Sequence, residues 1–207
     1  MLKLYNLVLG ALDTNCYIWA DEATKNAIVI DAPDSEDEII AEADKRGLKI
    51  TDVILTHGHF DHILALPKLL EKTKARLMIF EKTERFLSDS VLNLCHYIGK
   101  EMPPVKPDKI LFDKNIIDFC GNQIAVIHTP GHTEDSICLL CGDTLIAGDT
   151  LFKQSVGRWD HPTGDMKTEI NSIVSRLMCL DDNTNVYPGH GAATTIGEER
   201  RGNPYIV

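Results

Sequence analysis

The stretch that decides the fold is Thr56-His57-Gly58-His59-Phe60-Asp61-His62, which directly follows the apolar run of residues 50–55. The run predicts a buried strand, and the pattern from Asp61 to about Thr73 predicts a helix, so the stretch joins a strand to a helix. It places three imidazoles and one carboxylate within six positions. These are ligand types that a borderline divalent ion such as Zn²⁺ prefers.

The spacing of these four side chains indicates two metal positions and not one. His57 and His59 are two apart in extended backbone, so they project to the same side. Asp61 and His62 follow at the start of the helix and should aim elsewhere, while Gly58 suits a turn close to the ions. A polar surface loop is the alternative, but four potential ligands in this order favour a metal site.

Length and composition predict one soluble domain spanning residues 1–207, because 207 residues suffice for one substantial core. The net charge of −10 disfavours a nucleic-acid or anionic-membrane surface. No apolar run has the length of a membrane span, and the N-terminal apolar run is too short for a signal peptide. Six irregularly spaced cysteines then predict reduced thiols and a cytoplasmic protein.

Apolar periodicity predicts strands and helices in both halves of the chain. Strands are expected at residues 2–9, 14–19, 25–31, 50–55, 75–80, 110–112, 116–119, 124–127, 137–140, 145–147 and 186–187. Helices are expected at residues 35–47, 61–73, 82–99 and 165–180, and after Thr195. Ser35 with Glu38, and Thr195 with Glu198, have the spacing of a capping box. This order fits two sheets packed together with helices outside.

Three later positions repeat one local pattern, in which a β run and a turn lead to a metal-competent side chain. The turns Pro130-Gly131 and Pro188-Gly189 lead to His132 and His190, and Gly148 precedes Asp149. Pro-Gly sets a turn with positive φ at the glycine. Side chains at the carboxyl ends of strands can converge on one edge of a sheet, which raises the candidate ligands to five histidines and two aspartates.

The combination His57-x-His59-x-Asp61-His62, His132, Asp149 and His190 resembles the full ligand set of the metallo-β-lactamase superfamily, over essentially the whole chain. The resemblance implies an α+β fold, a four-layer αββα sandwich of two mixed sheets with helices outside. It also implies a binuclear site at the sheet edge. Carried over residue by residue, His57, His59 and His132 would hold one ion, Asp61, His62 and His190 the other, and Asp149 would bridge both.

The aspartate at the bridging position indicates which members of the superfamily this chain resembles most. True β-lactamases of the superfamily lack it, so Asp149 disfavours β-lactam hydrolysis and is similar to glyoxalase II. The segments 155–165 and 198–204 also look like short bacterial glyoxalase II-like hydrolases. Because the sequence ends soon after His190, we expect it to lack the C-terminal helical domain with which long glyoxalase II enzymes contact glutathione.

The resemblance implies a metal-dependent hydrolase that cleaves a thioester, as hydroxyacylglutathione hydrolase does, by a metal-bridging hydroxide that Asp61 helps to orient. The implied cofactors are two divalent ions, Zn first, with Fe or Mn as alternatives. Two dications offset by two aspartates and a hydroxide leave roughly one positive charge, which suits a small anionic thioester. The alternatives are a persulfide dioxygenase with one Fe(II) on His57, His132 and Asp149, or a lactone or phosphodiester hydrolase. A non-catalytic metal module is disfavoured because no ligand is missing.

Several other residues are weighed and left outside the site. Cys138 and Cys141 lie three apart on an expected strand and therefore face opposite sides, so they cannot clasp one metal. Structural support is the favoured interpretation of His128. Asp31 is either a partner of a metal ligand or a turn cap, and Arg158 either contacts substrate or pairs with an acidic neighbour. His96 either approaches substrate or, as the favoured interpretation, lies on the surface, and His161 lies in a loop that is close to the site in sequence only.

Overall fold

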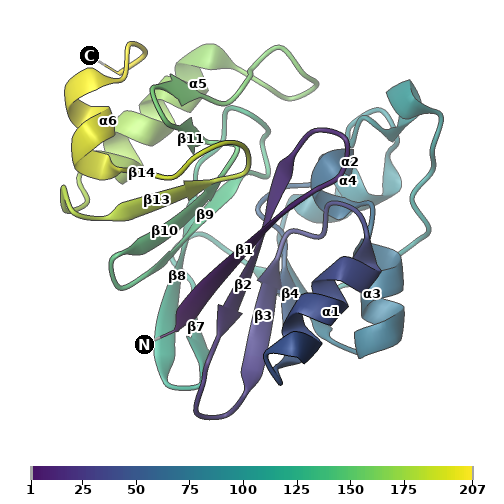
Figure 1. The fold of residues 1–207 in the computed structure, drawn as a ribbon. Coiled ribbons are helices and arrows are strands. Elements are labelled where there is room, and N and C mark those ends of the chain that lie inside the picture. Colours follow the sequence, from purple (N-terminus) through teal and green to yellow (C-terminus); the bar gives the residue numbers. More distant parts are fainter. Residues whose placement is uncertain (1, 207) are drawn as a thin grey trace. The chain divides into compact units, whose positions relative to one another are not determined.

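A six-stranded sheet organises each of the two units into which the chain divides (Figure 1). The computed structural model describes residues 2–206. The first unit extends to Leu111 and includes Cys120–Asn122, and the second holds Phe112–Phe119 and the residues from Gln123 on. The single domain expected for residues 1–207 stays a prediction.

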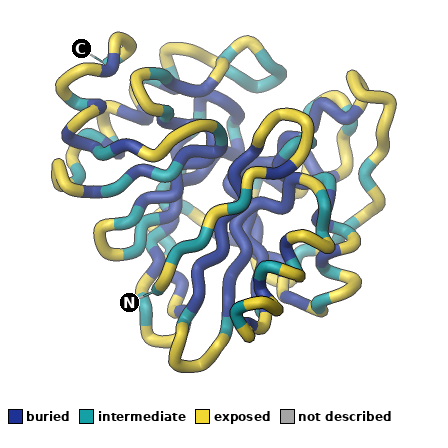
Figure 2. The backbone as a smooth tube through the Cα atoms, in the orientation of Figure 1, coloured by how far each residue is buried: buried dark blue, intermediate teal, exposed yellow. Residues whose placement is uncertain are grey.

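The sheet of the first unit is mixed. Strands β1 to β3 pair antiparallel, and β3 to β6 pair parallel. In order along the sheet they are β1 (Lys3–Leu9), β2 (Thr14–Ala20), β3 (Asn26–Ile30), β4 (Lys49–Ile54), β5 (Arg76–Phe80) and β6 (Lys109–Leu111). Every residue of β2 is buried, whereas β1 at the sheet edge alternates between exposed and half-buried residues up to Leu9, as Figure 2 shows. Strands β3 and β5 are buried after their first residue and are continuous apolar runs there.

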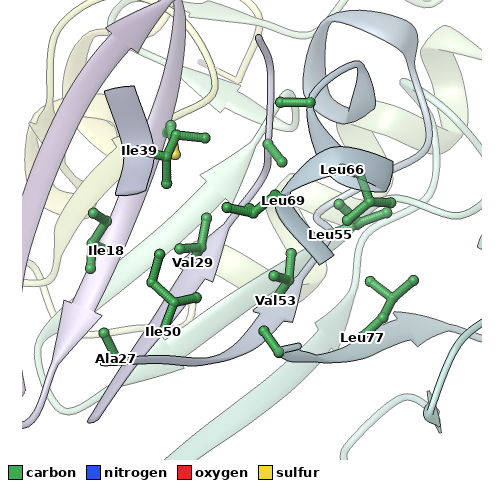
Figure 3. Packing of buried hydrophobic residues seen from close by; sticks show 14 of the residues in the cluster. Ile18, Ala27, Val29, Ile39, Ile50, Val53, Leu55, Leu66, Leu69 and Leu77 are labelled. Atoms are coloured by element: carbon green, nitrogen blue, oxygen red, sulfur yellow. The ribbon is translucent and has the colours of Figure 1, made fainter. Parts of the chain in front are cut away.

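Two helices of the first unit, α1 (Glu36–Lys45) and α3 (Leu66–Thr73), bury one apolar stripe each against this sheet. Ile39 of α1 and Leu69 of α3 join one core cluster with Val29 and Val53 of the strands (Figure 3). Each such side chain contributes about 1.5–3 kcal/mol when fully buried. The shorter elements are α2 (Phe60–Ile63), α4 (Thr83–Ser88) and a 3₁₀ turn η1 (Cys95–Ile98).

Two predicted helices are wrong in extent. The helix expected at residues 61–73 is divided into α2 and α3. Pro67, in the first turn of α3, has no N–H to donate to the carbonyl four residues earlier. The helix expected at residues 82–99 ends at Ser88. Beyond it, the Asp89 carboxylate accepts the backbone N–H groups of Val91 and Leu92, which replaces helical bonding by a turn.

The two capping predictions differ in outcome. Thr195 is confirmed as a helix cap, because its hydroxyl accepts the backbone N–H of Glu198 at 3.2 Å. The capping box at Ser35 is wrong, because Ser35 has a left-handed backbone (φ 57°) and its side chain caps nothing. The neighbouring Asp34 carboxylate instead accepts the N–H of Ser35 at 2.7 Å.

The sheet of the second unit is also mixed, since β10 and β13 pair parallel and the β8, β9 and β10 neighbours pair antiparallel. Its order is β14 (Thr194–Thr195), β13 (Asn185–Pro188), β10 (Thr144–Gly148), β9 (Ile137–Cys141), β8 (Asn122–His128) and β7 (Ile116–Phe119). A separate ribbon joins β11 (Leu151–Phe152) to β12 (Ser155–Val156). Strands β11, β12 and β14 were not expected.

The helices of the second unit are α5 (Met166–Ser172), which continues as a π-helical turn η2 (Ile173–Leu177), and α6 (Ile196–Gly202). Asp165 caps α5 by accepting the N–H of Thr168 at 2.7 Å. Ile173, Leu177 and Ile196 pack in one core cluster with the strands of this unit. The predicted α+β class with two mixed sheets is confirmed, and within residues 2–206 no helix combines the length and apolarity needed to cross a membrane.

Candidate functional site

The four predicted ligands of the first unit lie together at the carboxyl end of β4 and the start of α2. His57, His59 and His62 are buried. The ring of His57 lies 4.8 Å from that of His59 and 4.2 Å from that of His62, between centroids. His62 Nε2 lies 3.6 Å from Asp61 Oδ2. The compact strand-to-helix junction therefore brings these four donor groups together.

Asp31 holds this group in place from the end of β3. Its buried carboxylate accepts the backbone N–H of Thr56 at 2.7 Å, the Thr56 hydroxyl at 2.7 Å and His62 Nδ1 at 2.8 Å. A carboxylate on Nδ1 keeps the proton there and leaves the Nε2 lone pair for a metal. Of the two roles considered for Asp31, the structure shows both a contact with the predicted ligand His62 and a cap on the turn at Thr56.

Asp61 has its own support, which the sequence did not suggest. The hydroxyl of Thr14, at the start of β2, donates to Asp61 Oδ2 at 3.2 Å. Thr14 is buried, so the bond holds the carboxylate in one orientation. The contact joins residues 47 apart in sequence, and no local pattern marks such a pair.

The three predicted ligands of the second unit also converge. Asp149 Oδ2 lies 3.6 Å from His132 Nε2 and 3.5 Å from His190 Nε2. Asp149 and His190 follow the neighbouring parallel strands β10 and β13, whose carboxyl ends share one edge of the sheet. One aspartate between two imidazoles is the arrangement that a bridging carboxylate requires.

The donor atoms fit a divalent ion. Two ligands at about 2.0–2.1 Å from a tetrahedral ion lie about 3.4 Å apart. The separations of 3.6, 3.6 and 3.5 Å between imidazole nitrogen and carboxylate oxygen are close to that value. Buried imidazoles whose second nitrogen is held by a carboxylate, hydroxyl or carbonyl group are also typical of metal ligands. Each unit therefore carries a group of side chains suited to binding metal.

Glu169 of α5 supports His132 and was missed from the sequence. Its carboxylate is fully buried and accepts the backbone N–H of His132 at 2.7 Å, while His132 Nδ1 bonds to the Arg158 carbonyl at 2.7 Å. Burial raises the pKa of Glu169 to about 8, and the nearby Asp149 charge acts in the same direction. In the sequence, the only sign of this role was that Glu169 interrupts the apolar stripe of the helix predicted at residues 165–180.

The expectation of positive φ in the two Pro-Gly turns is confirmed at Gly131 (φ 146°) and wrong at Gly189. The N–H of Gly189 donates to the Gly148 carbonyl at 2.7 Å, which continues the pairing of β13 with β10. Positive φ occurs two residues later, at Gly191. His190 is therefore positioned by strand pairing more than by its Pro-Gly turn.

Gly131→Ala is expected to destabilise the fold well beyond the cost of its backbone angle. A Cβ at Gly131 would lie 2.2 Å from Glu169 Cα, so the backbone must move. Gly121 (φ 78°) is a matched control, because a Cβ there meets nothing within 4 Å. The control should lose about 1–2 kcal/mol from strain alone. Urea unfolding should show a clearly larger loss for Gly131→Ala, and equal losses would contradict the close approach.

The stability of the metal-free protein should depend on pH through Glu169. Its pKa lies near 8 when folded against an ordinary value of 4.5, so the folded state holds the proton more tightly. Relative to Glu169→Gln, the free energy of unfolding of the wild type should fall as the pH rises from about 4.5 to about 8. Chelator-treated wild type and variant can be compared by urea unfolding across this range. A constant difference would contradict the raised pKa.

The structure also places the residues that were left outside the site. His128 Nε2 contacts the Glu134 carbonyl at 2.9 Å, as expected of a supporting histidine. Arg158 pairs with exposed Asp160 at 2.9 Å. Cys138 lies in the core, where burial raises the pKa of its thiol to about 12, and Cys141 is half-buried. The ring of His161 lies 6.3 Å from that of His132.

Comparisons with known proteins agree with this architecture. Residues 9–190, which include all seven predicted ligands, match the family model of the metallo-beta-lactamase superfamily. Hydroxyacylglutathione hydrolase GloC of Haemophilus influenzae is 33% identical over 201 residues, covering 95% of this chain and 94% of its own length. The BLEG-1 B3 metallo-beta-lactamase structure has a TM-score of 0.93 at 30% identity, covering 99% of both chains.

The TTHA1623 structure, determined in a di-iron-bound form, has a TM-score of 0.83 at 32% identity and covers 97% of this chain and 99% of its own. The predicted metallo-β-lactamase fold is therefore confirmed. The family is one of metal-dependent enzymes, and its members among these relatives include hydrolases. On the match of the family model and the agreement in fold, this chain belongs to the metallo-β-lactamase superfamily.

Proposed function

We propose that this chain is a metal-dependent hydrolase that cleaves a thioester in the manner of hydroxyacylglutathione hydrolase. The observation that carries the proposal is the Asp149 carboxylate, 3.6 and 3.5 Å from the imidazoles of His132 and His190. A carboxylate at this position suits a bridge between two ions. The similarity to GloC, which is named for thioester hydrolysis, supports the same class of substrate.

In this proposal the two groups of ligands act as one binuclear centre. His57, His59 and His132 would hold one divalent ion, Asp61, His62 and His190 would hold the other, and Asp149 would contribute its carboxylate to both. The match of one family model across residues 9–190 supports treating the seven as a single set. Zinc is the first candidate from the donor types, and the di-iron form of TTHA1623 supports iron as the alternative.

Bound divalent ions would supply an activated water, since zinc lowers the pKa of its water to about 7. The residues of the chain position the reactants. Asp61, held by the Thr14 hydroxyl, offers a carboxylate oxygen that can accept a hydrogen bond from the attacking water. Asp31 fixes the proton of His62 on Nδ1. Because the leaving thiolate is stable near neutral pH, no separate general acid is required, and an anionic thioester is the proposed substrate.

The test combines metal analysis with a substrate panel. Protein purified without added metal is analysed for metal content and then assayed against thioesters that include S-lactoylglutathione. Two divalent ions per chain with thioester cleavage support the proposal. One iron per chain, together with oxygen uptake when a persulfide is the substrate, would instead identify the protein as a persulfide dioxygenase.

A second candidate, β-lactam hydrolysis, is favoured by one specific observation, the agreement in fold with BLEG-1. Asp149 argues against it. The same protein should therefore leave the β-lactam nitrocefin intact under conditions in which it cleaves thioesters. Rapid nitrocefin hydrolysis without thioester cleavage would reverse the assignment.

A further inference from the structure

A cavity of 210 Å³ lies within the first unit, directly beside Asp61. Asp61 and Thr14, which are joined by the 3.2 Å hydrogen bond, form part of its wall. The rest comes from the turn between β1 and β2, the segment before α1, the helix α2 and the region of η1. The exposed tip of this turn is visible in Figure 2.

The lining of the cavity is mainly apolar. Leu12, Pro33, Phe60, Leu64 and Ile98 all contribute to it. Leu12 and Ile98 are 52% and 41% exposed, so part of this apolar lining is open to solvent. The charged residues of the lining are one lysine, Lys100, and two aspartates, Asp34 and Asp61, so the lining carries no excess of positive charge. An apolar, uncharged group is therefore a better match than an anion.

Backbone hydrogen bonds tie the walls of the cavity to the segment that carries the ligands. Ala32 N–H donates to the His62 carbonyl at 2.8 Å, and Ala65 N–H donates to the Ala32 carbonyl at 3.0 Å. Phe60 N–H donates to the Asn93 carbonyl at 2.8 Å, which fixes α2 to the chain before η1. The cavity is thus preformed and held at a fixed distance from Asp61, as ligand sites commonly are.

We propose that this cavity binds the aliphatic acyl chain of the thioester, so that the enzyme prefers a medium-chain acyl group to a short hydroxyacyl group. The inference rests on the proposed function and specifies the acyl part of its substrate. The cavity volume of 210 Å³ equals the volume that about seven water molecules occupy in the liquid. A chain on the order of six carbons fits in that space. A chain in the cavity would bring its carbonyl end toward Asp61.

The first experiment measures kcat/KM for acetyl, butanoyl, hexanoyl and decanoyl thioesters of one thiol, N-acetylcysteamine. Burial of each methylene should raise kcat/KM about fourfold up to hexanoyl, with no further gain at decanoyl. Ala11→Trp and Leu64→Phe place added bulk on the lining and should flatten this dependence. Val8→Trp is the matched control, since Val8 is 57% exposed on the strand that leads into the same turn and lies outside the cavity. The control should keep the wild-type dependence.

The second experiment has a readout other than activity. Hexanamide, which cannot be hydrolysed as a thioester, is titrated into the protein and followed by amide chemical shifts. Shifts at Gly10, Ala11 and Leu12 that are lost in Ala11→Trp and kept in Val8→Trp support the cavity as the chain site. Chemical-shift changes at other residues, or no changes at all, would overturn the cavity as the site of the acyl chain.

The two experiments separate the inference from the proposed function. If the enzyme cleaves thioesters at a rate that does not depend on chain length, and hexanamide causes no shifts at the turn, the acyl site is overturned. The proposed thioesterase function would stand. Hexanamide binding at the turn, without cleavage of these thioesters or of the anionic S-lactoylglutathione, keeps the apolar site and overturns the thioesterase. An unchanged chain-length dependence in both Ala11→Trp and Leu64→Phe would also contradict the location.

Discussion

Replacement of Asp149 by alanine is expected to abolish hydrolysis and to release metal while the fold is kept. Asp149 is 9% exposed, and its Oδ2 is the atom to which both His132 and His190 point, at 3.6 and 3.5 Å. Alanine would remove the negative charge between two imidazoles that are predicted ligands. Loss of a residue that only orients a ligand costs 10–100-fold in metal affinity, so loss of the bridging ligand should cost more than about 100-fold.

Asp143→Ala provides the control for this prediction. Asp143 is an exposed aspartate in the turn between β9 and β10, on the same unit and near in sequence. Both variants are dialysed against a chelator of known affinity, and metal content, turnover and circular dichroism are measured. Asp143→Ala should behave as the wild type, whereas Asp149→Ala should retain its secondary structure without metal or activity. Full turnover by Asp149→Ala would refute the bridging role.

Two replacements of Asp31 are expected to have different effects. Asp31→Ala should mainly lower the stability of the fold, whereas Asp31→Asn should mainly lower metal affinity. Asp31 is 1% exposed and accepts three hydrogen bonds from Thr56 and His62 at 2.7–2.8 Å. Its backbone is left-handed (φ 61°), a conformation that costs alanine about 1–2 kcal/mol. Because Asp31→Ala also leaves buried donors without an acceptor, it should lower the free energy of unfolding by about 3–5 kcal/mol.

Asp31→Asn is expected to fold but to bind metal poorly. Asparagine tolerates a left-handed backbone, and its side-chain oxygen can still accept the N–H of Thr56. Its amide N–H₂ group, however, would face His62 Nδ1 and favour the tautomer with the proton on Nε2. A competition titration with a chromophoric chelator should then show a 10–100-fold loss of metal affinity. Wild-type affinity in Asp31→Asn would show that the charge on Asp31 does not orient His62.

The sequence predicted those parts of the fold that depend on long apolar patterns. The central strands and helices α1 and α3 follow from periodicity, because each buries a continuous run or one stripe. Strands β11, β12 and β14 are two residues long and too short to show a period. The helix predicted beyond Ser88 failed because Asp89 bonds to the backbone of the next turn, a competition that residue type alone does not resolve.

The candidate ligands were visible in sequence because each follows a strand or a turn, whereas the residues that support them were not. Glu169 bonds to His132 across 37 positions and Thr14 to Asp61 across 47. Such pairs form only when the sheet and helices pack, so no local pattern connects the two partners. Asp31 was partly predicted, since a polar residue at a strand end restricts its role to capping or to support of a ligand.

The most direct test is to crystallise the metal-loaded protein and to record an anomalous-difference map at the absorption edge of the metal found by analysis. Two peaks are predicted. One should lie about 2.0–2.2 Å from His57, His59 and His132, the other at similar distances from Asp61, His62 and His190, with Asp149 in contact with both. A single peak, or peaks that leave Asp149 or His190 without a metal contact, would contradict the binuclear centre on which the proposed hydrolysis depends.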